Sequence, residues 1–185
     1  MEVISNLLSA FGLSGAAGLN AYVPLLLMGL LDRLNVVHLQ DPVAWLSNPW
    51  VLLIVAVLGA LDFVGDKVPG VDHALHLVGG VVNAGAGALL FASQNHLVDV
   101  PPALSMVLGF MVAGGVQATR TAVRPVATAT TGGLANPVVS FLEDVSSLLV
   151  SVLAVFVPVL GVLLLVALVW WASRWWARRR RRKLA

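Results

Sequence analysis

The sequence DFVGDKVPGVDHALH (residues 62–76) separates two long apolar segments and places charged side chains on both sides of a Pro-Gly turn. The chain as a whole is 59% hydrophobic and only 11% charged. Soluble domains carry roughly 25% charged residues, so this chain lacks the polar surface that water requires. We therefore predict an integral membrane protein, in which this stretch joins two membrane-spanning helices and forms one part of a polar site.

The apolar segments on either side of this stretch predict the number of spans. Each span needs about 20 apolar residues, and the alternating pattern of a membrane β-barrel is absent. As one helix, the last apolar run would be about 58 Å long, well beyond a bilayer core of about 30 Å, so we divide it near Pro158. We predict an all-α transmembrane bundle of about six spans, over residues 3–31, 50–64, 73–91, 103–119 and 138–176, the last counted as two.

Caps and turns support these boundaries. Asn48-Pro49 and Asn136-Pro137 each combine a helix-capping residue with proline at the first helical position. Asp72 is a natural cap for the helix after the Pro-Gly turn. Two such starts, each followed by paired acids, suggest two inverted halves of three spans, as in many transporters.

The first apolar segment is interrupted. Small residues crowd positions 12–18, and Asn20 and Pro24 follow. Proline cannot donate a hydrogen bond to the carbonyl four residues earlier, which here belongs to Asn20. The segment is thus either one closely packed span or a broken, re-entrant helix.

The basic residues predict orientation. Arg174 and residues 178–183 supply seven of the eleven basic side chains, so we divide the chain into a membrane domain, 1–176, and a polybasic tail, 177–185. The positive-inside rule places this tail in the cytoplasm, and six spans would bring the N-terminus to the same side. No basic residue precedes the first apolar run, so we expect no cleaved signal peptide. We expect a multi-pass protein of the bacterial cytoplasmic membrane.

Partners are predicted from two surface features. The tail follows four tryptophans directly, which indicates anionic lipid at the headgroup level rather than nucleic acid. Gly80, Ala84, Gly87 and Ala88 share one helical face, which favours close contact with another span, within the chain, in a homo-oligomer or in another membrane protein. A helix that is merely rich in small residues and faces lipid is the alternative. The chain has no cysteine, and we expect no cofactor.

A second polar stretch follows the fourth span. Glu143 and Asp144 lie inside an apolar helix, where a charge costs about 2.5 kcal/mol or more, and Arg120 and Arg124 are the obvious counter-charges. Such pairs are either structural clamps or parts of an anion or proton site. We expect the two polar stretches to meet. The candidate substrate or ion pathway comprises Asn20, Asp62, Asp66, Lys67, Asp72, Arg120, Arg124, Ser140, Glu143 and Asp144.

A metal site is a weaker hypothesis for the first stretch. Asp66, Asp72, His73 and His76 carry suitable ligand atoms at close spacing, but no motif sets their order. The competing interpretation is structural: Asp72 caps a helix, Lys67 pairs with Asp66, and the histidines face lipid headgroups.

Three segments resemble a known family. SGAAGLNAYVPLLLMGLL (14–31), DFVGDKVPGVDH (62–73) and NPVVSFLEDV (136–145) are similar to the bacterial membrane family labelled domain of unknown function 4126. The resemblance implies a polytopic bacterial membrane protein. It implies no activity and no site residues.

Three functions remain open. Transport of a small solute or a lipid-linked anion, coupled to protons or cations, is the leading hypothesis. An accessory subunit of a membrane complex, with purely structural charges, is the second. An intramembrane metal-dependent enzyme comes last, because no HExxH-type motif or recognised nucleophile is present. We therefore expect no enzymatic activity.

Overall fold

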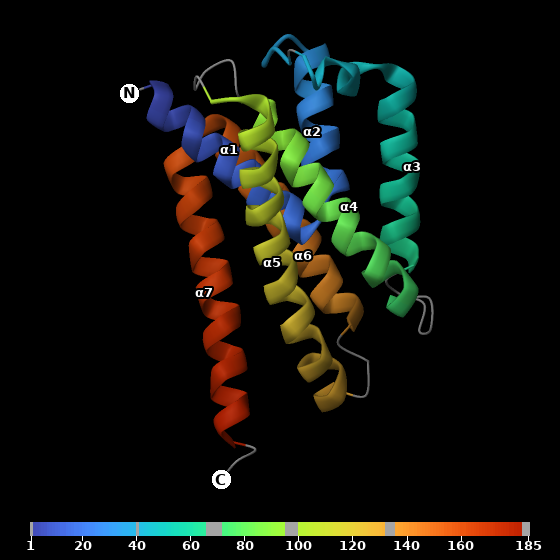
Figure 1. Cartoon of the computed structure of the whole chain (residues 1–185). Coiled ribbons are helices and arrows are strands. Elements are labelled where there is room, and N and C mark those ends of the chain that lie inside the picture. Colours follow the sequence, from blue (N-terminus) through green and yellow to red (C-terminus); the bar gives the residue numbers. More distant parts are fainter. Residues whose placement is uncertain (1, 40, 66–71, 95–99, 132–135, 183–185) are drawn as a thin grey trace.

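The computed structural model describes residues 2–39, 41–65, 72–94, 100–131 and 136–182 (Figure 1). In this part of the chain every regular element is a helix, which confirms the predicted all-α membrane bundle. Its elements are α1 (Glu2–Leu19), α2 (Tyr22–Arg33), the short 3-10 helix η1 (Ala44–Ser47), α3 (Pro49–Gly65), α4 (Asp72–Ala92), α5 (Pro102–Thr131), α6 (Asn136–Phe156) and α7 (Pro158–Arg182).

The first apolar segment is a helical hairpin, not a single span. Helix α1 descends into the bundle and α2 returns toward the end where α1 began (Figure 1). Leu13 of α1 and Met28 of α2 belong to one buried cluster and line the same cavity, although a straight helix would separate them by about 22 Å. The structure therefore shows a broken helix in this segment, and its re-entrance into the membrane stays a prediction.

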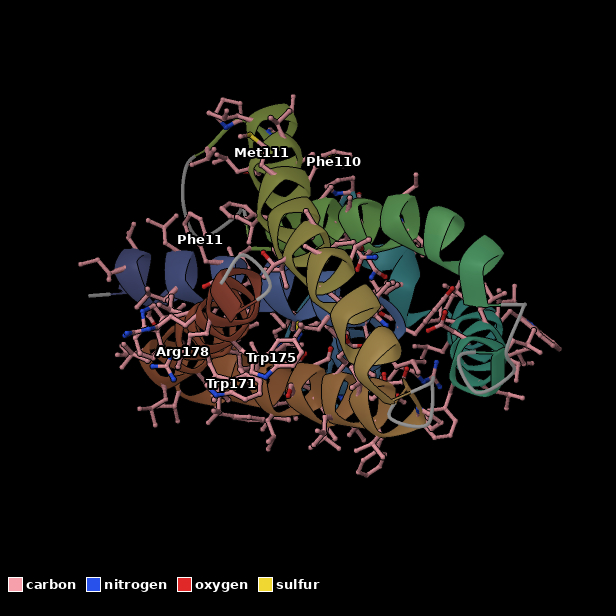
Figure 2. The ribbon with its side chains drawn as sticks, turned by 90° about the horizontal axis from the view of Figure 1, so that it is seen from below. Phe11, Phe110, Met111, Trp171, Trp175 and Arg178 are labelled. Atoms are coloured by element: carbon pink, nitrogen blue, oxygen red, sulfur yellow. The ribbon has the colours of Figure 1, made fainter. Side chains whose placement is uncertain are left out.

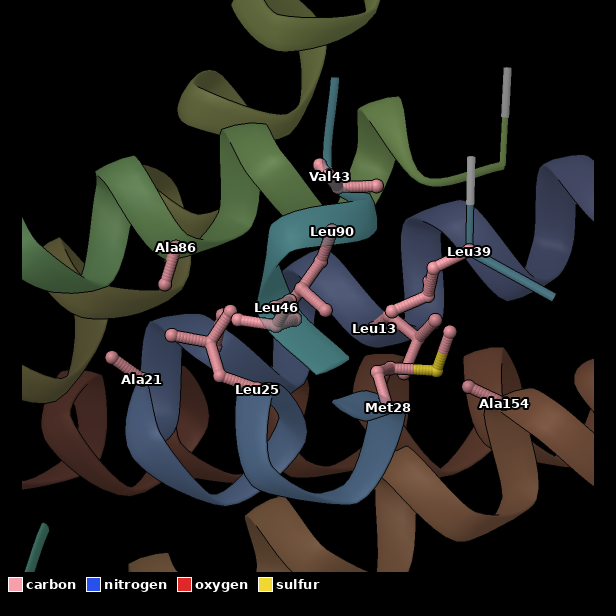
Figure 3. Close-up of a cluster of buried hydrophobic side chains, with 11 residues drawn as sticks. Leu13, Ala21, Leu25, Met28, Leu39, Val43, Leu46, Ala86, Leu90 and Ala154 are labelled. Atoms are coloured by element: carbon pink, nitrogen blue, oxygen red, sulfur yellow. The ribbon is translucent and has the colours of Figure 1, made fainter. Parts of the chain in front are cut away.

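Helix α1 is the centre of the bundle and packs against α4, α5, α6 and α7. Most of its inward residues are small, and Ser14, Ala16 and Ala17 are fully buried. Small side chains let several helices approach one helix closely, which is how membrane helices gain packing energy without a hydrophobic drive. Figure 3 shows the cluster that joins α1 and α2 to η1 and α4, in which Leu13, Met28 and Leu90 are at most 1% exposed.

Most predicted helix boundaries are confirmed. Asn48 Oδ1 accepts a hydrogen bond of 2.9 Å from the N–H of Trp50, so Asn48 caps α3 as expected. The last run divides at Val157, and α7 begins at Pro158. It continues into the tail as far as Arg182.

Three helices are long and apolar enough to cross a membrane, over Pro102–Ala122, Pro137–Phe156 and Pro158–Trp175, among the residues searched.

One boundary was predicted wrongly. The turn expected at residues 128–133 begins later, because α5 runs through Pro125 to Thr131. A proline removes only one bond from the helical ladder, and the hydrogen bonds on either side can carry the helix past it. Helix α5 is therefore 12 residues longer than expected at this end.

The small-residue face of α4 packs against α5. Gly87 lies so close to Ala113 and Gly109 of α5 that a methyl group there would collide with both. Ala84 is 3% exposed, and Ala88 lies beside Gly109. This confirms the predicted close contact, within the chain. Gly80 has no such neighbour within 4 Å of an added Cβ.

The helix hairpin also changes the expected placement of the N-terminus. We call the end with the start of α1 and the end of α2 the loop end, and the end with the last turn of α7 the tail end. The two ends lie on opposite sides of the bundle (Figure 1). The six-span expectation placed both termini on one side, because it counted residues 3–31 as one complete crossing. The inverted repeat stays a prediction.

Candidate functional site

The site forms where α1 ends and α2 begins. Asn20 is 6% exposed, and its Oδ1 accepts hydrogen bonds from the N–H groups of Tyr22 (2.9 Å) and Val23 (3.3 Å). This is the bonding of a helix cap, and it satisfies two donors at the start of α2. Pro24 supplies no N–H to the helix, so the carbonyl of Asn20 needs another donor. The local sequence thus both breaks the helix and caps the second piece.

Side chains from α5 and α6 bond the carbonyls at the end of α1. Arg120 Nη1 donates to the carbonyl of Leu19 at 2.8 Å. The hydroxyl of Ser147 donates to the carbonyls of Ala16 (3.0 Å) and Asn20 (3.2 Å). A cation at a helix C-terminus is favourable, because the helix dipole is negative there. The break is therefore bonded by groups far away in the sequence.

Two acids of α6 complete the cluster. Arg120 Nε donates to Glu143 at 2.8 Å, and the two side chains are only 9% and 14% exposed. Asn20 Nδ2 donates to Asp144 Oδ1 at 2.7 Å. Consecutive positions of a helix point about 100° apart, so Glu143 can contact α5 while Asp144 contacts α1. The structure confirms the predicted pairing of Arg120 with an acid of this stretch. We call Asn20, Arg120, Glu143, Asp144 and Ser147 the tip cluster.

Sequence analysis missed several buried polar groups near the tip cluster. Asn83 Nδ2 donates to Gln117 Oε1 at 2.9 Å between α4 and α5, and both are at most 6% exposed. Ser147 and Ser151 are fully buried on α6. Their spacing from Asp144 (three and seven residues) is a helical-face signal that could have identified them. Ser140, which was predicted, is 3% exposed.

The structure says less about the first polar stretch. Asp62 is half-buried near the end of α3 and acts electrostatically on Tyr22, next to the helix break. Gly59 of the same helix packs against the Tyr22 side chain. The end of α3 thus lies beside the start of α2, next to the helix break, as the expectation of one shared site requires for Asp62.

The remaining predicted residues lie outside the described part. Asp66 and Lys67 belong to residues 66–71, and Asp72, His73, His76 and Arg124 belong to helices but have undescribed side chains. Among the described residues no group of three potential ligands could hold a metal ion. The metal hypothesis therefore stays a prediction.

A second bonded carboxylate orders the loop after α2. Asp32 Oδ1 accepts the N–H of Leu39 at 2.7 Å, and its Oδ2 accepts the hydroxyl of Ser47. Partial burial acts to raise the pKa of Asp32, but the hydrogen bonds from Ser47 and Leu39 and the nearby His38 outweigh it, so the pKa is lowered. This carboxylate ties the end of α2 to η1.

The C-terminal part of α7 carries the predicted aromatic and basic side chains. Arg174 lies 4.8 Å from the ring centre of Trp170, a cation–π distance. Figure 2, a view from the tail end, shows Trp171, Trp175 and Arg178 around the end of this helix. Trp170 and Trp171 are more than half exposed.

Together these observations define a small helical membrane bundle with a helical hairpin whose tip is bonded by a buried ion pair. The chain belongs to the family described as domain of unknown function (DUF4126), whose model matches residues 7–178. No curated protein and no solved structure matches the chain.

Proposed function

We propose that the protein moves a small solute across the membrane and that the tip cluster controls its path. The helix break carries this proposal. In membrane transporters, discontinuous helices place unpaired backbone groups at substrate and ion sites inside the bundle. Here the chain has such a break in its most buried helix, with two carboxylates and an arginine directed at it.

The break argues for transport over a purely structural role. A continuous helix satisfies its own carbonyls and would pack as well as α1 does, with no buried charge to stabilise. Holding Glu143 and Arg120 in the bundle costs desolvation energy that a scaffold does not need. A site that opens and closes does need groups that can exchange partners. Glu143 and Asp144 are the groups that would couple solute movement to a proton or cation.

The charges at the site favour a small solute over a lipid-linked anion. Arg120 is already bonded to Glu143 and to the carbonyl of Leu19. An anionic substrate would have to displace Glu143 from its guanidinium partner. We therefore assign Arg120 to gating, in place of attracting substrate.

The basic residues indicate the orientation of the bundle. Only Arg33 of the eleven basic residues belongs to the loop end by its place along the chain. The positive-inside rule then places the tail end in the cytoplasm of a bacterial cell, and the loop end, with the N-terminus, on the opposite side. The tryptophans and arginines of α7 would bind anionic lipid at the cytoplasmic surface. We further propose that small-residue helix faces pack against a second copy of the chain or against another membrane protein.

Flux into liposomes tests this proposal. The purified protein is reconstituted, and entry of glycerol, erythritol and urea is followed by stopped-flow light scattering, with a pH-sensitive dye inside the vesicles. We expect flux above that of protein-free liposomes. Glu143→Gln should change it by about tenfold or more, the factor that corresponds to 1.4 kcal/mol. Asp41→Asn, on the exposed loop, is the matched control and should leave the flux unchanged.

The outcome also separates the alternatives. No flux of any solute through a correctly folded native protein would contradict transport and favour the accessory subunit. Flux that is the same in Glu143→Gln and in the native protein would remove the tip cluster from the path.

A further inference from the structure

A second polar feature lies at the loop end, away from the tip cluster. The start of α1, the end of α2, residues 36–39 and the ends of α4 and α6 line a partly open cavity of about 310 Å³. Ligand pockets of proteins begin at about 300 Å³, so this space fits one small molecule. None of its lining residues belongs to the tip cluster.

The walls of the cavity are polar but uncharged. Ser5, Asn6 and Gln94 supply hydroxyl and carboxamide groups, and His38 is the one titratable side chain among the described lining residues. No carboxylate, lysine or arginine of the described chain lines it. A charged ligand would lose its hydration there without gaining a counter-charge, which is costly. The lining therefore favours an uncharged ligand.

The hydrogen-bond pattern of the walls adds a second restriction. The hydroxyls of Ser9 and Ser93 already donate to the carbonyls of Ala154 (2.6 Å) and Leu90 (2.7 Å), so toward the cavity they can only accept. Gln94 uses one N–H on Ser93 at 3.1 Å and keeps its second N–H and its carbonyl oxygen. The carboxamide of Asn6 makes no hydrogen bond with the described part of the chain. The walls thus offer acceptors at Ser9 and Ser93 and both N–H donors and carbonyl acceptors at the two carboxamides, which matches a ligand that donates and accepts several hydrogen bonds.

The floor of the cavity is apolar and closed. Leu13 is fully buried and Met28 is 1% exposed, and together they separate the cavity from the deeper residues of α1. Asn20 lies seven residues beyond Leu13, about 10 Å along the helix. The cavity and the tip cluster therefore lie on opposite sides of one packed apolar layer within the hairpin.

We infer that this cavity is a binding site for a small uncharged molecule with several groups that donate and accept hydrogen bonds, of the polyol or urea class. The inference rests on the proposed transport and names its substrate class. The cavity binds the solute at the loop end, the Leu13–Met28 layer closes the path beneath it, and the tip cluster lies on the far side of that layer.

Single cysteines test the cavity directly, because the native chain has none. Asn6→Cys is placed in the cavity wall, and Leu34→Cys, 69% exposed at the same end, is the matched control. Each is reacted with neutral, cationic and anionic methanethiosulfonates of similar size. Relative to the control, both charged reagents should modify Asn6→Cys at least about tenfold more slowly than the neutral one, because the site offers them no counter-charge. Equal relative rates would overturn the inference.

Protection by the solute is the second measurement. Glycerol, erythritol or urea should slow the modification of Asn6→Cys and leave that of Leu34→Cys unchanged, whereas glycerol 3-phosphate should protect neither. Protection by the phosphate alone, or by no solute, would overturn the ligand class. If Asn6→Cys does not fold, Gln94→Cys, at another lining residue, takes its place.

Flux measured on the same liposomes separates the two proposals. Protection without flux supports the cavity and contradicts transport. Flux without protection supports transport and contradicts the cavity as its solute site.

Discussion

Removing Arg120 should destabilise the bundle more than any other single charge change among the described residues. Arg120 bonds Glu143 and the carbonyl of Leu19, each at 2.8 Å, and its side chain is 9% exposed. In Arg120→Ala the carboxylate of Glu143, 14% exposed, loses this partner, and a carbonyl at the break loses its donor. Breaking such a buried pair typically costs about 3–5 kcal/mol.

This cost can be converted into a melting temperature. For chains of this length 1 kcal/mol shifts the midpoint by about 2–4 °C, so Arg120→Ala should melt about 6–20 °C below the native protein. Tryptophan fluorescence of the protein in detergent micelles measures it. Arg120→Lys keeps the charge but cannot hold two partners in fixed directions. Its melting midpoint should therefore lie between those of Arg120→Ala and the native protein. Arg174→Ala, exposed on the tail helix, is the control and should shift the midpoint by no more than about 4 °C, since exposed ionic contacts contribute at most about 1 kcal/mol.

A double-mutant cycle isolates the pair itself. Glu143→Ala together with Arg120→Ala removes both charges, so the double variant should be more stable than the sum of the single effects predicts, by about 1.5 kcal/mol or more. The reasoning would be refuted by additive single effects, or by an Arg120→Ala midpoint within about 2 °C of the native value.

Three further predictions concern other parts of the fold. Ser147→Ala should cost about 1–3 kcal/mol in detergent melting, because the carbonyl of Asn20 loses its donor, whereas that of Ala16 keeps the N–H of Asn20; no change would mean that water replaces the hydroxyl. Gly109→Ala should cost about 1–3 kcal/mol, since its Cβ would lie 2.6 Å from the Phe91 Cβ, whereas Gly115→Ala, with open space, should be neutral; equal effects would contradict the α4–α5 seam. The lowered pKa of Asp32 contributes stability that is complete above its unfolded pKa of about 3.9 and is lost as the pH falls through the folded value. The loss of stability in Asp32→Asn should therefore be constant near neutral pH and disappear in acid, and a pH-independent difference would contradict it.

The sequence by itself determined the class of protein and most of its helix boundaries. Low charge and long apolar runs require a membrane bundle, because such a chain cannot cover itself in water. Asn48-Pro49 and Pro158 mark helix starts through bonds that involve only near neighbours, and such local rules can be read without a structure. The acids of α6 and Arg120 could also be identified from the sequence, because a charge in an apolar helix needs a partner wherever that partner lies in the chain.

Only the tertiary structure decided how the first segment folds and which groups meet at its break. Small residues followed by Asn20 and Pro24 allow either one closely packed span or a broken helix, because Pro24 leaves the same carbonyl without its helical donor in both. The donors that resolve this choice, Arg120 and Ser147, are more than 90 residues away along the chain. The position of the N-terminus and the cavity at the loop end depend on that hairpin, because long-range packing creates them and no local pattern encodes them.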